Sequence, residues 1–180
     1  MRVNLGCGDR YAPDWVNVDH AGSPHRKDMT LDLAAPLLTT GGTPWPYGSI
    51  AHVYAGHVLE HLSIENCHYL LSALLPFMTP KGSIMVVGPD IPVAEAMIAD
   101  GTFDFRYGHT LESLKYGGHR WPGDAHLWEC SGPLVADILE ECGWGFVADV
   151  GIREVPPFWP VADRAPQWQC AVFATVERPS

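Results

Sequence analysis

The sequence predicts an α/β fold built on a mostly parallel β-sheet. Short apolar segments alternate with helical patterns along the 180 residues, and this alternation is typical of parallel strands joined by crossover connections. The apolar run at residues 84–87 fits a strand that is buried on both faces. The last two apolar segments, at 146–150 and 168–176, are joined by an irregular stretch without a helical pattern. We therefore expect that final pair of strands to be antiparallel.

The remaining elements are predicted from apolar spacing and from residues that begin or end helices. Strands are expected at residues 3–5, 15–18, 29–31, 52–55 and 83–88. Three helices are expected. Ser63 and Ser131 are the expected N-caps of the first and the third, and Pro92 fits the first turn of the second. The first of these helices is expected to reach residue 78 and to be ended by Pro80 and Gly82.

The composition is that of one folded domain over residues 1–180. Hydrophobic residues make up 47% of the chain, charged residues 18%, and the formal net charge is −10. This charge repels phosphate backbones and anionic lipid head groups, so neither nucleic acid nor a membrane surface is expected as a partner. The five cysteines form no CxxC pair, and no apolar run reaches the roughly 18–20 residues of a membrane span. We expect a cytoplasmic protein with reduced cysteines.

A glycine turn follows the first predicted strand, and an acid ends the second. The turn is Gly6-Cys7-Gly8 and the acid is Asp19. In open α/β sheets such glycines let the backbone approach a nucleotide, and the acid can bind both ribose hydroxyls. Asp9 follows in place of the rest of a GxGxxG fingerprint, and an acid is unfavourable beside a phosphate. The residues therefore favour a ligand with a ribose, an adenine and a cationic centre, unless the glycines only turn the chain.

Together with later segments, this turn resembles motif I of the class I S-adenosylmethionine-dependent methyltransferases. Residues 3–8 match the glycine motif, and the run from His57 to Leu62 is similar to the "LEH" segment after the fourth strand. Residues 75–82 resemble the L-x-P-x-G turn, and His-Leu-Trp at 126–128 resembles the late motif. The resemblance spans nearly the whole chain. It implies a Rossmann-like three-layer sandwich with strand order 3-2-1-4-5-7-6, the last strand being antiparallel.

The resemblance also implies S-adenosylmethionine as the cofactor, with S-adenosylhomocysteine as the product. Asp19 matches the ribose-binding acid, and Asp32 matches the acid on the adenine side. The cofactor-binding residues that we predict are Leu5, Gly6, Cys7, Gly8, Asp19, His20, Asp32, Leu33, Gly56 and His57. Only ten residues separate Gly8 from Asp19, against about 20 in the dinucleotide pattern. The first crossover helix is therefore expected to be very short or absent.

Three polar residues follow the fourth predicted strand, at the edge where this fold carries out its reaction. A helical turn over residues 57–61 would place His57, Glu60 and His61 on one face. A histidine there suits the base that a hydroxyl acceptor needs, and the catalytic residues we predict are His57, His61 and His126.

A metal site is the alternative interpretation of the same turn. Small-RNA 2′-O-methyltransferases and ubiquinone-pathway O-methyltransferases look similar here and hold a divalent ion with Glu-x-x-Glu-His and a remote ligand. In this sequence His57 stands in place of the first Glu. We therefore expect no metal, and the candidate ligands, should one bind, are Glu60, His61 and a remote His119 or His126.

Residues 102–130 lose apolar periodicity and concentrate aromatic residues, histidines and glycines. Trp121 and Trp128 belong to this stretch, and Gly117, Gly118 and Gly123 supply flexible points. Such an insertion is typical of a substrate lid, although a satellite hydrophobic cluster over the sheet edge would have the same composition. Aromatic faces suit a sugar ring or a flat small-molecule acceptor.

One function leads among four that the sequence leaves open. It is O-methylation of a small-molecule or glycan acceptor by an S-adenosylmethionine-dependent methyltransferase. The alternatives are a non-catalytic S-adenosylmethionine-binding or scaffold protein, N-methylation of a protein or small molecule, and an NAD-dependent oxidoreductase. The intact glycine and acid set argues against a decayed site, and the missing third glycine argues against NAD.

Overall fold

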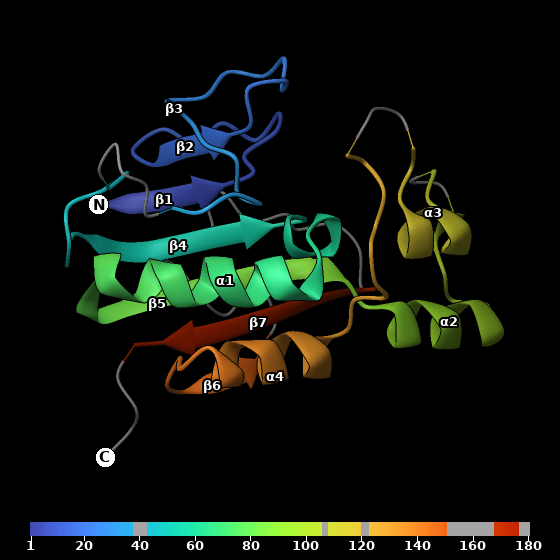
Figure 1. Cartoon of the computed structure of the whole chain (residues 1–180). Coiled ribbons are helices and arrows are strands. Elements are labelled where there is room, and N and C mark those ends of the chain that lie inside the picture. Colours follow the sequence, from blue (N-terminus) through green and yellow to red (C-terminus); the bar gives the residue numbers. More distant parts are fainter. Residues whose placement is uncertain (38–42, 106–107, 120–122, 151–167, 177–180) are drawn as a thin grey trace.

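The computed structural model describes residues 1–37, 43–105, 108–119, 123–150 and 168–176 (Figure 1). Within them one sheet of seven strands has the order β3-β2-β1-β4-β5-β7-β6. The strands are β1 (Arg2–Leu5), β2 (Val16–Asp19), β3 (Met29–Thr30), β4 (Ile50–Gly56), β5 (Met78–Pro89), β6 (Val147–Asp149) and β7 (Gln169–Thr175). All neighbours are parallel except β7, which is antiparallel to β5 and β6. The predicted order and the reversed last strand are confirmed.

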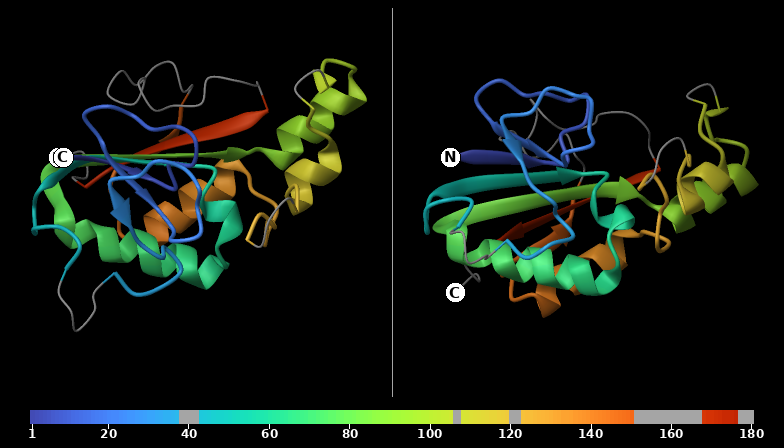
Figure 2. Two further views of the ribbon diagram at one scale, coloured as in Figure 1. Left: turned by 90° about the horizontal axis from the view of Figure 1, so that it is seen from above. Right: turned by 45° about the horizontal axis from the view of Figure 1, so that its top comes forward.

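Two helices, α1 (Ile64–Leu74) and α4 (Gly132–Glu141), pack on the same face of the sheet (Figure 2). Their apolar stripes bury Cys67, Leu70, Leu71 and Leu74 from α1 and Val135, Ile138 and Leu139 from α4. These side chains join sheet residues in the main core. Ser63 and Ser131 accept hydrogen bonds at the two helix N-termini, as their N-cap positions predict.

The loop between β1 and β2 covers the other face of the sheet. Ala12 and Trp15 of this loop pack on Tyr54, Met85 and Val87. None of the described residues between β1 and β2 is helical, so the prediction of a very short or absent first crossover helix is confirmed. The outer layer on this side is therefore a loop wherever the structure describes it.

Buried asparagines hold this loop in place. Asn17 Oδ1 accepts hydrogen bonds from the Ala12 N–H at 2.9 Å and from Asn4 Nδ2 at 3.0 Å. Asn17 Nδ2 in turn donates to the carbonyl oxygens of Ala12 and Trp15, both at 2.9 Å. Polar groups of a buried loop need such partners, and here side chains supply what a helix would supply internally.

The end of α1 differs from the sequence prediction. The helix ends at Leu74, a 3₁₀ turn follows as η2 (Leu75–Phe77), and residue 78 already begins β5. Pro76 explains the early end, because proline breaks the helical hydrogen-bond ladder. Pro80 and Gly82 lie inside β5, where the register with β4 is irregular, a position that tolerates both residues.

Beyond the carboxyl ends of the strands lie two further helices, α2 (Ile91–Ala99) and α3 (Leu111–Tyr116) (Figure 1). The second was not predicted, because a two-turn helix is too short to show apolar periodicity. Its start does carry a signal, a capping box between Thr110 and Ser113. Among the described residues, no helix is both long and apolar enough to cross a membrane.

Candidate functional site

The candidate site lies at the edge of the sheet where β1, β2 and β4 end. The arrowheads of these strands point the same way in Figure 1, toward the side on which α2 and α3 lie. Open α/β sheets bind ligands outside the carboxyl ends of their strands. The glycine turn, Asp19 and the turn after β4 are all found at this edge.

The glycine turn has the backbone conformation that only glycine adopts easily. Gly6 has φ 59° and Gly8 has φ 49°, both in the left-handed region. A Cβ on Gly6 would overlap Cγ2 of Val58, whereas a Cβ on Gly8 would meet no atom within 4 Å. Gly6 therefore permits close packing against the segment after β4, and Gly8 faces open space.

Asp19 holds the glycine turn from the neighbouring strand. Its Oδ2 accepts the Gly8 N–H at 3.0 Å, and its Oδ1 accepts the His20 N–H at 2.8 Å. The residue is 7% exposed. A carboxylate has about four acceptor positions, so two hydrogen bonds leave capacity on both oxygens for a pair of vicinal hydroxyls.

Cys7 contributes its backbone rather than its thiol. Its N–H donates to the Val18 carbonyl at 3.0 Å, which ties the turn to β2. Burial, and next the charge of Asp19, raise the pKa of Cys7 to about 11. The side chain is therefore a neutral thiol at physiological pH and has no role as a nucleophile.

The other predicted cofactor residues take less enclosed positions. His20 and Asp32 are exposed, and Asp32 Oδ1 accepts the Ala34 N–H at 3.0 Å just after β3. Leu33 packs partly buried against the main core, and Gly56 ends β4. They lie at the ends of β2, β3 and β4, and their cofactor roles stay a prediction.

His57 follows β4 in a strained conformation, with φ 56°. Its Nδ1 lies 3.1 Å from Glu60 Oε1, and its Nε2 lies 2.7 Å from Nε2 of Gln169. The Gln169 amide can only donate through this nitrogen, so His57 Nε2 accepts and Nδ1 carries the proton given to Glu60. The side chain of His57 is 32% exposed, whereas that of Glu60 is 1% exposed.

His61 and His126 meet beside Glu60. Their rings are in edge-to-face contact, with centroids 4.8 Å apart. His61 Nδ1 lies 3.2 Å from the Ala125 carbonyl oxygen, and His126 Nδ1 lies 2.7 Å from the Leu114 carbonyl oxygen. Glu60, His61 and His126 form a group whose ligand atoms all lie within 4.8 Å of one another.

Its histidine neighbours keep Glu60 ionised although it is buried. Burial raises its pKa, but the hydrogen bond from His57 and the electrostatic interactions with His57 and His61 outweigh burial, so the pKa lies below its usual range. Burial is the main cause that lowers the pKa of His126 below its usual value. A carboxylate and a neutral imidazole therefore face each other at neutral pH.

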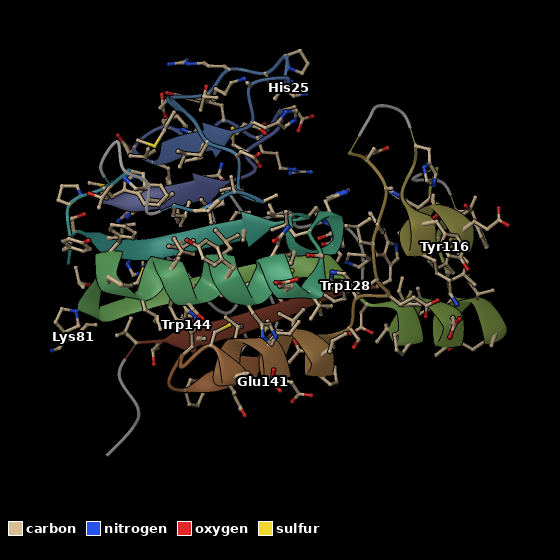
Figure 3. All side chains as sticks on the ribbon, viewed as in Figure 1. His25, Lys81, Tyr116, Trp128, Glu141 and Trp144 are labelled. Atoms are coloured by element: carbon tan, nitrogen blue, oxygen red, sulfur yellow. The ribbon has the colours of Figure 1, made fainter. Side chains whose placement is uncertain are left out.

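The segment that carries His126 is fixed to the turn after β4, the 3₁₀ helix η1 (Leu59–His61). The Leu127 N–H donates to the Glu60 carbonyl at 2.8 Å. Trp128 Nε1 donates to the carbonyl oxygens of Leu59 and Leu62 at 3.1 and 3.0 Å. Figure 3 shows Trp128 beside this turn. The "LEH" turn and the late motif of the sequence are therefore in direct contact.

One residue predicted as a metal ligand lies away from this group, and one residue at the site was not predicted from the sequence. His119 is exposed and does not join the group of Glu60, His61 and His126, and Trp121 lies outside the described residues. Gln169 was missed, although the predicted reversal of the last strand places its first residue at this edge. Its register partner is Pro89, the last residue of β5.

Comparisons with known proteins address the fold. No protein-family model matches the sequence, and no curated protein matches it. Solved structures do match it, over 97% of the chain in each of three cases. They are a "SAM dependent methyltransferase" of Archaeoglobus fulgidus (16% identity, TM-score 0.60), a protein of Nostoc punctiforme described as an O-methyltransferase (10%, 0.56), and human N-acetylserotonin methyltransferase in complex with SAM (12%, 0.51).

The fold is that of the class I S-adenosylmethionine-dependent methyltransferases. The strand order, the antiparallel seventh strand and the structural matches agree on this. The chain spans 85% of the Archaeoglobus methyltransferase but about half of the other two proteins, 51% of the Nostoc protein and 46% of the human methyltransferase.

Proposed function

We propose that this chain is an S-adenosylmethionine-dependent methyltransferase that methylates an oxygen of a small-molecule or glycan acceptor. The observation that supports it most is the contact between Gly8 and Asp19, because it joins the glycine turn and the acid at the ligand-binding edge of a methyltransferase fold. Structural neighbours with the same fold include a protein described as an O-methyltransferase.

The residues at this edge fit the cofactor. Asp19 keeps acceptor capacity on both carboxylate oxygens for the ribose hydroxyls, and the Gly8 turn opens to solvent space rather than to packed side chains. Asp32 and Leu33 follow β3 and would border the adenine. When bound, S-adenosylmethionine supplies a methyl group on a sulfonium, a leaving group that is already activated.

The chain's own task is to place the acceptor and to receive its proton. Methyl transfer gains most from alignment of the reacting atoms in a dry site, and a hydroxyl acceptor also needs a base. His57 is the residue we assign to that role, since its Nε2 is the unprotonated nitrogen and its side chain reaches the surface. Gln169 holds this nitrogen in place when no acceptor is bound.

Calorimetry tests the cofactor assignment directly. S-adenosylhomocysteine should bind, whereas ATP and NAD should not, because the turn lacks a third glycine and carries an acid. Asp19→Ala should weaken S-adenosylhomocysteine binding more than about tenfold, or about 1.4 kcal/mol, through loss of hydrogen bonds to a charged group.

The matched control is Asp137→Ala, which removes an exposed acid from α4 on one outer face. It should leave binding unchanged. Tight binding of NAD or ATP, or normal S-adenosylhomocysteine binding by a folded Asp19→Ala variant, would refute the assignment. A panel of hydroxyl acceptors assayed by mass spectrometry for a gain of one methyl group then tests catalysis, and binding without any transfer would favour the scaffold alternative.

A further inference from the structure

Three potential metal ligands converge beyond the end of β4. The ligand atoms of Glu60, His61 and His126 lie within 4.8 Å of one another. The first two come from η1, and the third comes from the segment that Trp128 fixes to that turn. The group is therefore assembled by two segments that are far apart in the sequence but bonded to each other in the fold.

In its neutral form, each of the two histidines presents an unprotonated Nε2. A backbone carbonyl oxygen only accepts hydrogen bonds, so the Nδ1 atoms beside Ala125 and Leu114 must carry protons. The neutral rings then keep a lone pair on Nε2. A hydrogen bond from the second ring nitrogen to a carbonyl is also the arrangement that orients histidines in metal sites.

Glu60 adds an oxygen without a hydrogen-bond partner. Its Oε1 is bonded to His57, but its buried Oε2 has no partner among the described residues. An ionised, unpaired oxygen in a side chain that is 1% exposed is costly. Two nitrogen lone pairs and one carboxylate oxygen repel one another. A cation among them would remove this repulsion and would give Glu60 Oε2 a partner.

We propose that Glu60, His61 and His126 bind a divalent first-row transition metal ion, with Zn²⁺ as the best fit. Two imidazoles and one carboxylate favour this class of ion over Mg²⁺ or Ca²⁺, which prefer all-oxygen sites. Three protein ligands leave a fourth position open for water or another oxygen ligand. His57 is not a ligand, because Glu60 and Gln169 occupy its two nitrogens. This inference goes beyond the proposed function and its test needs no methyl transfer.

The test uses the full chain without a polyhistidine tag, stripped of metal with a chelator. Co²⁺ should bind with a stoichiometry of one and give the visible absorption of a low-coordinate site, and Zn²⁺ should displace it. Zn²⁺ should also raise the melting temperature, because a ligand that binds only the folded state stabilises it.

Glu60→Gln and His126→Gln should each weaken Zn²⁺ binding by more than about 100-fold, beyond the range typical of outer partners of a metal site. His119→Gln, an exposed histidine of the same stretch, is the matched control and should bind as the wild type does. Glu60→Gln keeps the shape of the side chain, and its melting curve without metal verifies that it folds.

The proposal is overturned if the folded wild type takes up no Co²⁺ or Zn²⁺, which would leave a hydrogen-bonded histidine cluster only. It is also overturned if both Gln variants bind as tightly as the wild type. Neither result would affect S-adenosylhomocysteine binding, so failure of this proposal is separable from failure of the proposed function.

Discussion

Replacing each glycine of the turn by alanine should produce two different defects. Both variants place a Cβ in left-handed backbone, which costs about 1–2 kcal/mol. In Gly6→Ala the Cβ also overlaps Cγ2 of Val58, a side chain in the main core, and overpacking adds about 1–3 kcal/mol. Gly6→Ala should therefore lower the free energy of unfolding by about 2–5 kcal/mol, and Gly8→Ala by about 1–2 kcal/mol.

Gly48→Ala supplies the matched control for backbone strain. Gly48 has φ 64° and, like Gly8, has no atom within 4 Å of an added Cβ, but it precedes β4 at the opposite end of that strand. Gly8→Ala and Gly48→Ala should therefore cost similar stability in urea denaturation. Only Gly8→Ala should also weaken S-adenosylhomocysteine binding, because its methyl group would project into the space we assign to the cofactor.

A double-mutant cycle isolates the overlap with Val58. Val58→Ala removes Cγ2, so it should cost less stability in the Gly6→Ala background than in the wild type. The coupling energy should fall within the 0.5–3 kcal/mol typical of side chains in contact. Equal losses for Gly6→Ala and Gly8→Ala, together with strict additivity in the cycle, would refute the packing argument.

The further predictions concern the turn after β4, helix α3 and the loop between β2 and β3. Trp128→Phe removes the N–H shared by the Leu59 and Leu62 carbonyls, which keep other donors, and should lower the free energy of unfolding by about 0.5–1.5 kcal/mol in urea denaturation. Tyr116→Ala, at an exposed side chain, should leave urea denaturation unchanged and raise the acceptor KM. Hydrogen bonds from Asn17 lower the pKa of Asp28 in the folded chain. Asp28→Asn should therefore reduce the free energy of unfolding at pH values above the ordinary carboxyl pKa, and this reduction should disappear as the pH falls through the lowered pKa of the folded chain. Asparagine tolerates left-handed backbone, so His57→Asn should fold. It should reduce turnover about 100-fold with little change in S-adenosylhomocysteine binding. Unchanged turnover would show that the base is another residue.

The part of the site that the sequence predicted well is local. The Gly6–Gly8 turn and Asp19 follow consecutive parallel strands, and parallel neighbours end at the same edge, so their contact follows from the order of elements alone. The short spacing between them also predicted the missing crossover helix. The helix N-caps were equally readable, because Ser63 and Ser131 act on residues three positions away.

The part that was not predicted depends on contacts between distant segments. Nothing in the local sequence distinguishes His119 from His126 as the partner of His61, since that choice is made by hydrogen bonds of Leu127 to the turn after β4. Gln169 reaches His57 across 112 positions. Only the strand order of the folded sheet brings such residues together, so their contact cannot be predicted from the local sequence.

The stretch at residues 102–130, predicted as a substrate lid, divides into two parts by its contacts. Its first part packs on α2 through Phe103 and Leu114, which share a small core with Ile91. Its last part is bonded to the turn after β4 through Trp128. Among the described residues of this stretch, the exposed large apolar side chains are Phe105, Tyr116 and Leu127, at 58%, 55% and 59% exposure. We therefore propose that these three side chains contact the acceptor, whereas the buried aromatic residues Phe103 and Trp168 pack in the small core beside α2.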